Sequence, residues 1–121
     1  MGGIMRKRYS HRVSVDCSVI LAGENVVAEC RALDLSLPGC LMVSAKRMYP
    51  GEYIQLQLFL PDQQPPLHVT LAAIRWVDGF TFGTEFIRTS RIDQYRLDEF
   101  MRRHPAYDGS ATRKVRPALI T

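Results

Sequence analysis

The sequence has no uninterrupted apolar run long enough to cross a lipid bilayer, for which about 20 residues are needed. The N-terminus is basic, but the residues after it alternate between polar and apolar. A secretion signal would instead contain a continuous apolar segment. We therefore expect a cytoplasmic protein with no membrane span.

Cysteine is scarce, and its spacing argues against the usual cysteine-based sites. Cys17, Cys30 and Cys40 are odd in number and lie far apart, and no two of them form a CxxC pair. Neither a disulfide framework nor a zinc site is indicated by this pattern. We predict that the cysteines are small buried apolar residues and that the protein has no metal site.

Sequence patterns typical of enzymes are missing as well. The chain contains no GxSxG, Walker A or HExxH motif. His11, His68 and His104 lie far apart, on different expected elements. We therefore expect that the protein is not an enzyme, has no catalytic residues and needs no cofactor.

The composition is that of one folded, basic domain. Of the 121 residues, 46% are hydrophobic and 23% are charged, with a formal net charge of +4. This charge is compatible with an anionic partner, but DNA- and RNA-binding domains usually have a denser basic stripe, so we expect neither nucleic acid. We expect a domain over residues 6–104, a flexible N-terminus at 1–5 and a flexible basic tail at 105–121.

Alternating apolar and polar residues predict six strands joined by short turns. The expected strands cover residues 13–21, 26–33, 40–44, 53–60, 67–77 and 80–87. Asp78 and Gly79 form a typical tight hairpin turn between the last two. Such a series predicts a mainly β fold, in which a six-stranded antiparallel sheet closes or nearly closes into a barrel.

After the last expected strand, the hydrophobic period changes to that of a helix. Ser90 can cap this helix, with Asp93 three residues later, and Pro105 would end it. A loose apolar stripe at helical spacing follows the cap and consists of Ile92, Tyr95, Leu97, Phe100 and Met101. We expect the helix to pack across the barrel.

Positive charge is concentrated just before the first expected strand, in an arm that we define as residues 6–12. Arg8 and Arg12 within it are spaced RxxxR, and Lys7 precedes them. The planar donors of arginine fit a phosphate, or the O6 and N7 edge of guanine. RxxxR is a common pattern, and taken alone it is better explained by a solvated basic tail.

The segment "DLSLPG" places Asp34, Ser36 and Gly39 in the pattern DxSxxG after the second expected strand. In a turn, aspartate and serine usually bond to their own backbone, and glycine adopts the dihedral angles that other residues avoid. The same residues can present a carboxylate, a hydroxyl and open backbone to a ligand. A carboxylate accepts hydrogen bonds from the N1–H and N2–H2 edge of guanine.

Taken together and in this order, the two motifs resemble those of the PilZ domain family, from about Arg6 to near Arg103. The segments "IRWVDG" (74–79) and "FGTEF" (82–86) resemble the family's last two strands and its characteristic glycine followed by an aromatic. The resemblance implies a six-stranded antiparallel β-barrel with a C-terminal α-helix. It also implies the family's usual function, which is a receptor for the bacterial second messenger cyclic di-GMP.

The resemblance assigns roles to the two motifs. Arg8 and Arg12 match the arginines that contact phosphates and guanine edges. Asp34, Ser36 and Gly39 match the residues that contact a guanine on the barrel surface. These five residues are the expected centre of the ligand site.

Two further residues are implicated by their position. Lys7 lies just before RxxxR, where the residue can influence how many ligand molecules bind. Trp76 falls on a strand where some family members place an aromatic ring against a guanine. A tryptophan in the core or at the barrel edge fits the sequence equally well.

We therefore expect a receptor or adaptor that binds cyclic di-GMP, closes its arm over the ligand and signals to an unidentified protein effector. The alternative is an adaptor of the same fold that binds proteins without nucleotide. Adaptors of that kind typically lack the arginines or the DxSxxG residues, and both are present here. A nucleic-acid-binding barrel is disfavoured because the expected strands have few exposed aromatics beside basic residues.

Overall fold

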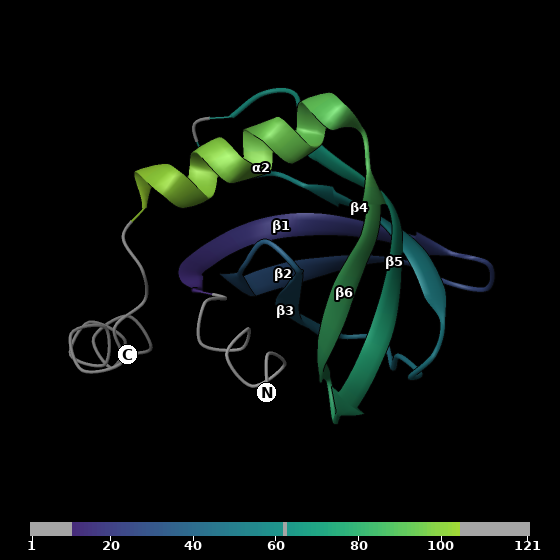
Figure 1. Cartoon of the computed structure of the whole chain (residues 1–121). Coiled ribbons are helices and arrows are strands. Elements are labelled where there is room, and N and C mark those ends of the chain that lie inside the picture. The colour runs from purple at the N-terminus through teal and green to yellow at the C-terminus, as the bar shows by residue number, and fades with distance from the viewer. Residues whose placement is uncertain (1–10, 62, 105–121) are drawn as a thin grey trace, which may run out of the picture.

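The structure is a computed structural model that describes residues 11–61 and 63–104. The expected flanking segments at 1–5 and 105–121 lie outside these residues. The described chain contains six strands and a helix after them (Figure 1). In chain order they are β1 (Val13–Gly23), β2 (Val27–Leu35), β3 (Gly39–Ser44), β4 (Tyr53–Leu58), β5 (Leu67–Asp78), β6 (Thr81–Thr89) and α2 (Arg91–Arg103).

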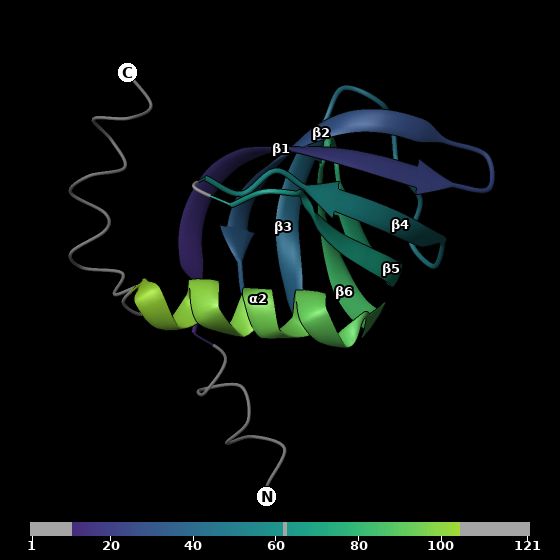
Figure 2. The ribbon, with the colours of Figure 1, turned by 90° about the horizontal axis from the view of Figure 1, so that it is seen from above.

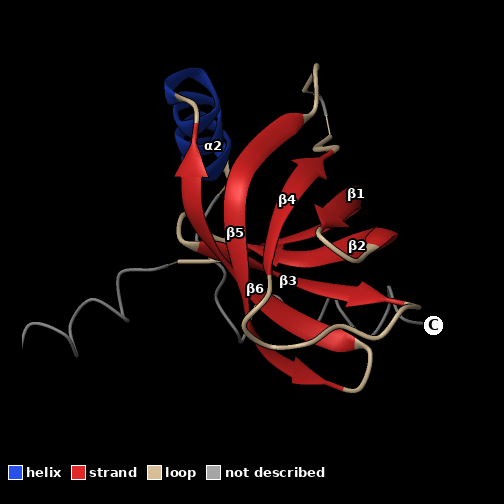
Figure 3. Cartoon of the chain, turned by 90° about the vertical axis from the view of Figure 1, so that its right-hand side faces the viewer, coloured by secondary structure: helices blue, strands red, loops and turns tan. Residues whose placement is uncertain are grey.

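The strands form one closed barrel in the order β1-β2-β3-β6-β5-β4, and every neighbouring pair is antiparallel. This confirms the predicted fold. Successive strands pair directly except β3 and β4, which are not neighbours in the barrel. β4 instead pairs with β1 on one side and β5 on the other, and this pairing closes the barrel (Figure 3).

The second strand is longer than its sequence pattern indicates. We expected Asp34 and Leu35 in a turn, but they pair with Ser14 and Val13 of β1 and so belong to β2. The pairing of β2 with β3 shifts register after Ala32. Because of this shift, Asp34 and Leu35 are both buried, which simple alternation does not allow.

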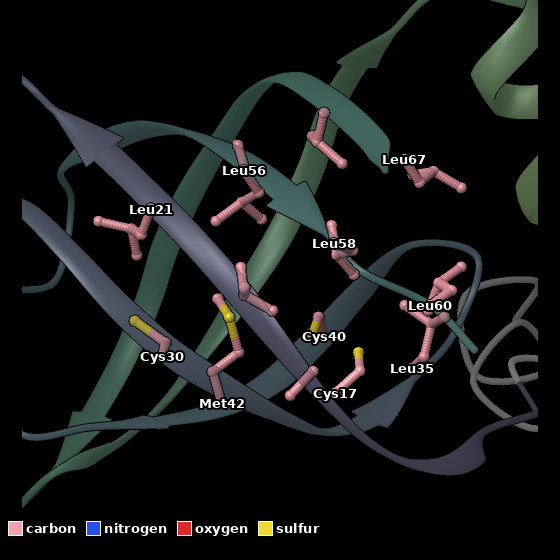
Figure 4. Packing of buried hydrophobic residues seen from close by; sticks show 14 of the residues in the cluster. Cys17, Leu21, Cys30, Leu35, Cys40, Met42, Leu56, Leu58, Leu60 and Leu67 are labelled. Atoms are coloured by element: carbon pink, nitrogen blue, oxygen red, sulfur yellow. The ribbon is translucent and has the colours of Figure 1, made fainter. Parts of the chain in front are cut away.

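The barrel interior is filled by the apolar residues of all six strands, as their alternation requires. Figure 4 shows part of this core, including Cys17, Cys30 and Cys40. These three cysteines are free and buried, as predicted. Burial raises the pKa of the Cys17 thiol to about 11 and also raises the pKa values of the other two.

The helix α2 begins as predicted, because the Ser90 hydroxyl accepts a hydrogen bond from the Asp93 backbone N–H at 3.1 Å. Its buried residues are Leu97, Phe100 and Met101, which join the barrel core. The predicted stripe is wrong at Ile92 and Tyr95, which are 73% and 62% exposed. At about 100° per residue, these two side chains project from the opposite face of the helix.

Figure 2 shows α2 lying along one side of the barrel. Polar contacts attach it to the segment before β5 and to the first residues of β5. Arg96 pairs with Asp93 at 2.8 Å and donates to the carbonyl oxygens of Pro65 and Pro66. The other Asp93 oxygen accepts from the His68 backbone N–H at 3.3 Å.

Among the described residues, no helix has the length and apolar character that crossing a membrane requires.

Candidate functional site

A pocket of about 470 Å³ lies between the start of β1, the β2–β3 turn, β5 and β6. It brings together five of the seven predicted site residues, namely Arg12, Asp34, Ser36, Gly39 and Trp76. The other two, Lys7 and Arg8, lie outside the described residues. The pocket is also lined by residues that the sequence did not single out as site residues: Pro38, Cys40, Leu41, Arg75, Gly83, Thr84 and Glu85.

Hydrogen bonds within the turn itself hold Ser36 and Gly39. The Ser36 backbone N–H donates to the Gly39 carbonyl oxygen at 2.9 Å. The Ser36 hydroxyl accepts from the Gly39 N–H at 3.2 Å and lies 3.1 Å from the Gly39 carbonyl oxygen. The Pro38 carbonyl accepts from the Phe86 N–H on β6 at 2.8 Å, so the turn is fixed to the barrel wall. The serine therefore shapes this side of the pocket.

Gly39 is required for a reason other than the one its sequence context suggests. Among the described glycines, only Gly51 and Gly79 have positive φ angles, so the expected special dihedral at Gly39 is wrong. A Cβ atom on Gly39 would instead lie 2.1 Å from the carbonyl oxygen of Thr84. Only glycine allows β3 to approach β6 this closely.

Asp34 enters the pocket from β2, and Arg12 enters it from just before β1. Asp34 lies near the end of β2, opposite Leu41 of β3, and is only 9% exposed. Val13 opposes Leu35 in the antiparallel pairing, so Arg12, the preceding residue, lies beside Ser36. Arg12 is exposed, while the carboxylate is held close to the barrel wall.

Trp76 lies on the outer surface of the barrel, where it is 46% exposed. It opposes Gly83 of β6, and a Cβ on Gly83 would lie 2.3 Å from its indole Nε1. The indole therefore packs directly over the glycine backbone. This position rules out a core tryptophan and gives the pocket an accessible aromatic surface.

Two charged residues complete the pocket and were missed in the sequence. Arg75 and Glu85 form an ion pair, with Nη2 and Oε1 2.6 Å apart. Both lie within the segments "IRWVDG" and "FGTEF", but the sequence assigned neither of them a role in the site. Their proximity depends on the pairing of β5 with β6. With Arg12 and Asp34, they give the described pocket two arginines and two carboxylates.

The residues that line the pocket provide several groups that can hold a ligand. Cys40 is the pocket's one thiol, and burial raises its pKa well above the ordinary value, so it stays protonated at neutral pH. No cluster of three or more potential metal ligands occurs within the described ranges. Paired donors, a carboxylate and an aromatic face are groups that bind a nucleotide.

One argument from the sequence does not hold in the structure. We expected the strands to have few exposed aromatics beside basic residues. Six aromatics are exposed among the described residues, namely Tyr49, Tyr53, Phe59, Trp76, Phe80 and Tyr95, and four of them fall within the expected strands. The guanidinium carbon of Arg47 lies 5.9 Å from the ring centroid of Phe80. Aromatic exposure therefore gives no reason to disfavour a nucleic acid.

Similar folds occur among solved structures. A PilZ domain with c-di-GMP of YcgR from Escherichia coli has a TM-score of 0.59 and 17% identity, over 95% of this chain and 98% of that one. A PilZ domain of CeSA from a cellulose-synthesizing bacterium has a TM-score of 0.60 and 14% identity, over 75% of this chain and 94% of that one.

A third structure is longer than this chain. The Bacillus subtilis inhibitor of motility, MotI/DgrA, has a TM-score of 0.63 and 20% identity over 79% of this chain. The match spans 50% of that protein. No curated protein matches the sequence significantly.

The comparison with protein families is more specific than these structural likenesses. The family described as PilZ domain matches residues 6–103, which include the arm, all six strands and the helix. The six-stranded barrel and its C-terminal helix agree with this match. The chain belongs to the PilZ domain family.

Proposed function

We propose that this protein is a receptor for cyclic di-GMP and that it binds the nucleotide in the pocket between the β2–β3 turn, β5 and β6. The observation that supports this most strongly is the convergence of Arg12, Asp34, Ser36 and Trp76 on one pocket from separate parts of the chain. Family membership and the c-di-GMP bound to the similar Escherichia coli domain favour the same ligand.

Each group has a distinct task in this proposal. The Asp34 carboxylate accepts from the N1–H and N2–H2 edge of a guanine. Arg12 and Arg8 donate to phosphates or to a guanine edge. Trp76 provides a face on which a base stacks. Ser36 and Gly39 hold the turn, and Lys7 influences the number of ligand molecules bound.

The charge of the pocket gives the arm its role. Two arginines and two carboxylates line the described pocket, so their formal charges cancel. Cyclic di-GMP has two phosphates and therefore two negative charges. The missing positive charge is available from Arg6, Lys7 and Arg8 of the arm, which lie four to six residues before Arg12. We expect ligand binding to close the arm over the barrel.

Closure of the arm would create a surface that differs between the free and bound protein. A partner that prefers the closed form is then recruited by the ligand, because binding shifts the population toward that form. We propose that this partner is an unidentified protein effector in the cytoplasm. We expect the protein to act as a binding module rather than an enzyme, with no DNA or RNA as its partner.

Calorimetric titration with cyclic di-GMP tests the proposal. We expect saturable binding to the wild type, no binding of GTP, and about tenfold to a hundredfold weaker binding to Arg12→Ala, because a charged hydrogen bond contributes about 1.5–3 kcal/mol. Arg31→Ala is the control, since Arg31 pairs with Asp16 on the exposed surface and does not line the pocket. Absence of both heat and thermal stabilisation with the wild type would refute the receptor function and favour a ligand-independent adaptor.

A further inference from the structure

Two consecutive residues of β5, Arg75 and Trp76, are both exposed and both line the pocket. In a regular strand, successive side chains point to opposite faces. Here Ile74 opposes Thr84 and Trp76 opposes Gly83, which are consecutive residues of β6. Arg75 is therefore an extra residue of β5 with no pairing partner on β6. This is a β-bulge, which redirects a side chain. The bulge places a guanidinium beside the indole on the outside of the barrel.

Glu85 holds Arg75 in this place. The Nε and Nη2 atoms of Arg75 both lie 2.6 Å from Oε1 of Glu85. Glu85 itself opposes Gly39, at the end of the DxSxxG turn. The two side chains are 54% and 48% exposed, and an ion pair this exposed adds little to stability. The effect of the pair is to orient the guanidinium at the pocket.

The side of the guanidinium that Glu85 does not occupy suits one particular base edge. Arginine has five N–H donors in a plane, and its two terminal nitrogens can donate in parallel. The O6 and N7 atoms of guanine are acceptors at the matching spacing. Adenine has an amino group in place of O6 and cannot accept both bonds. The edge of a base stacked on Trp76 would lie beside Arg75.

We propose that Arg75 is a specificity-determining residue, which reads the O6 and N7 edge of a guanine stacked on Trp76, and that Glu85 positions it. This inference rests on the proposed cyclic di-GMP site and adds to it a contact that selects guanine. Asp34 accepts from the N1–H and N2–H2 edge. The two residues therefore recognise different edges of guanine.

The test removes the acceptor from the ligand and the donor from the protein. Calorimetric titration compares cyclic di-GMP with its 7-deaza analogue, in which each N7 is replaced by C–H. The proteins are the wild type, Arg75→Ala and Arg31→Ala. Arg31 is the matched control because it also forms an exposed ion pair, 2.8 Å from Asp16, and does not line the pocket.

The quantity compared is the affinity for cyclic di-GMP divided by the affinity for the 7-deaza analogue. We expect this ratio to be about tenfold larger for the wild type and Arg31→Ala than for Arg75→Ala. Arg75→Lys keeps the charge but replaces the planar fork with a single ammonium, so we expect its ratio to lie between those of the wild type and Arg75→Ala. Circular dichroism melts establish that each variant is folded.

The outcomes separate this inference from the proposed function. If the wild type binds neither ligand, the receptor function is refuted and the inference with it. If the wild type binds but the ratio is the same in Arg75→Ala, the function stands and base reading by Arg75 is overturned. A uniform loss of affinity for both ligands would belong to this second outcome and would indicate a phosphate contact.

Discussion

Gly39 and Gly83 lie where another part of the protein leaves no room for a side chain. At Gly39 the obstacle is the backbone of β6, and at Gly83 it is the indole of Trp76. A backbone atom can move only with its strand, whereas an exposed indole can rotate away. The two glycines are therefore expected to respond differently to the same substitution.

Gly39→Ala should destabilise the protein by about 1–3 kcal/mol, because its Cβ would lie 2.1 Å from the Thr84 carbonyl oxygen and push β3 away from β6. Urea unfolding measures this change. A midpoint equal to that of the wild type would show that the strands do not approach as closely as described.

Gly83→Ala should leave the free energy of unfolding within about 0.5 kcal/mol of the wild-type value, because the displaced indole is already half exposed. It should nevertheless weaken cyclic di-GMP binding, since the stacking surface has moved. Unfolding and calorimetric titration of the same preparation separate the two effects. Wild-type affinity would show that the ligand does not stack on Trp76.

The helix α2 is attached to the barrel by a compact polar cluster as well as by its apolar face. Arg96 and Asp93 are only 18% and 15% exposed, and Arg96 also bonds to two backbone carbonyls. On the same helix, Arg102 pairs with Glu99 at 3.0 Å but is 64% exposed. The two ion pairs have the same sequence spacing and very different surroundings.

Arg96→Ala should cost about 1–3 kcal/mol, because it leaves the nearly buried Asp93 carboxylate without its cation and two carbonyls without a donor. Arg102→Ala should cost less than about 1 kcal/mol, since exposed pairs contribute little. Urea midpoints compare the two. Equal losses would mean that burial does not determine the strength of these pairs.

The whole barrel is built around an interior that contains three protonated thiols. Burial raises the pKa of Cys17 from 9.0 to about 11. Between these values the thiol ionises in the unfolded chain but stays neutral in the folded one, so rising pH favours unfolding. This contribution to stability is fully present below about pH 9 and is lost as the pH approaches about 11.

We therefore expect the urea midpoint to fall between about pH 9 and pH 11, and to fall less steeply in Cys17→Ala. Lysine and tyrosine titrate in the same range in both proteins, so the difference between the two slopes reports Cys17. If the urea midpoint fell equally steeply with pH in both proteins, the raised pKa of Cys17 would be contradicted.

Much of the molecule was predictable because local patterns coincide with tertiary structure. The alternation in β1 and the cap at Ser90 depend on neighbouring residues alone, and both were predicted. The end of β2 and the exposure of Ile92 were not, because they depend on strand pairing and on which helix face the barrel covers. The Arg75 bulge likewise exists only in relation to β6. The family motifs indicated Asp34 and Arg12, whereas Glu85 lies within "FGTEF" but was assigned no role in the site.

Trp76 allows the central claim to be tested directly, because it is the chain's single tryptophan and lines the proposed site. The measurement is a fluorescence titration with cyclic di-GMP, alongside GTP and Arg12→Ala. We predict a saturable change in Trp76 emission with cyclic di-GMP, a shift to higher concentrations in Arg12→Ala and no change with GTP. Calorimetric binding without any change in Trp76 emission would place the ligand elsewhere, and no binding at all would refute the receptor.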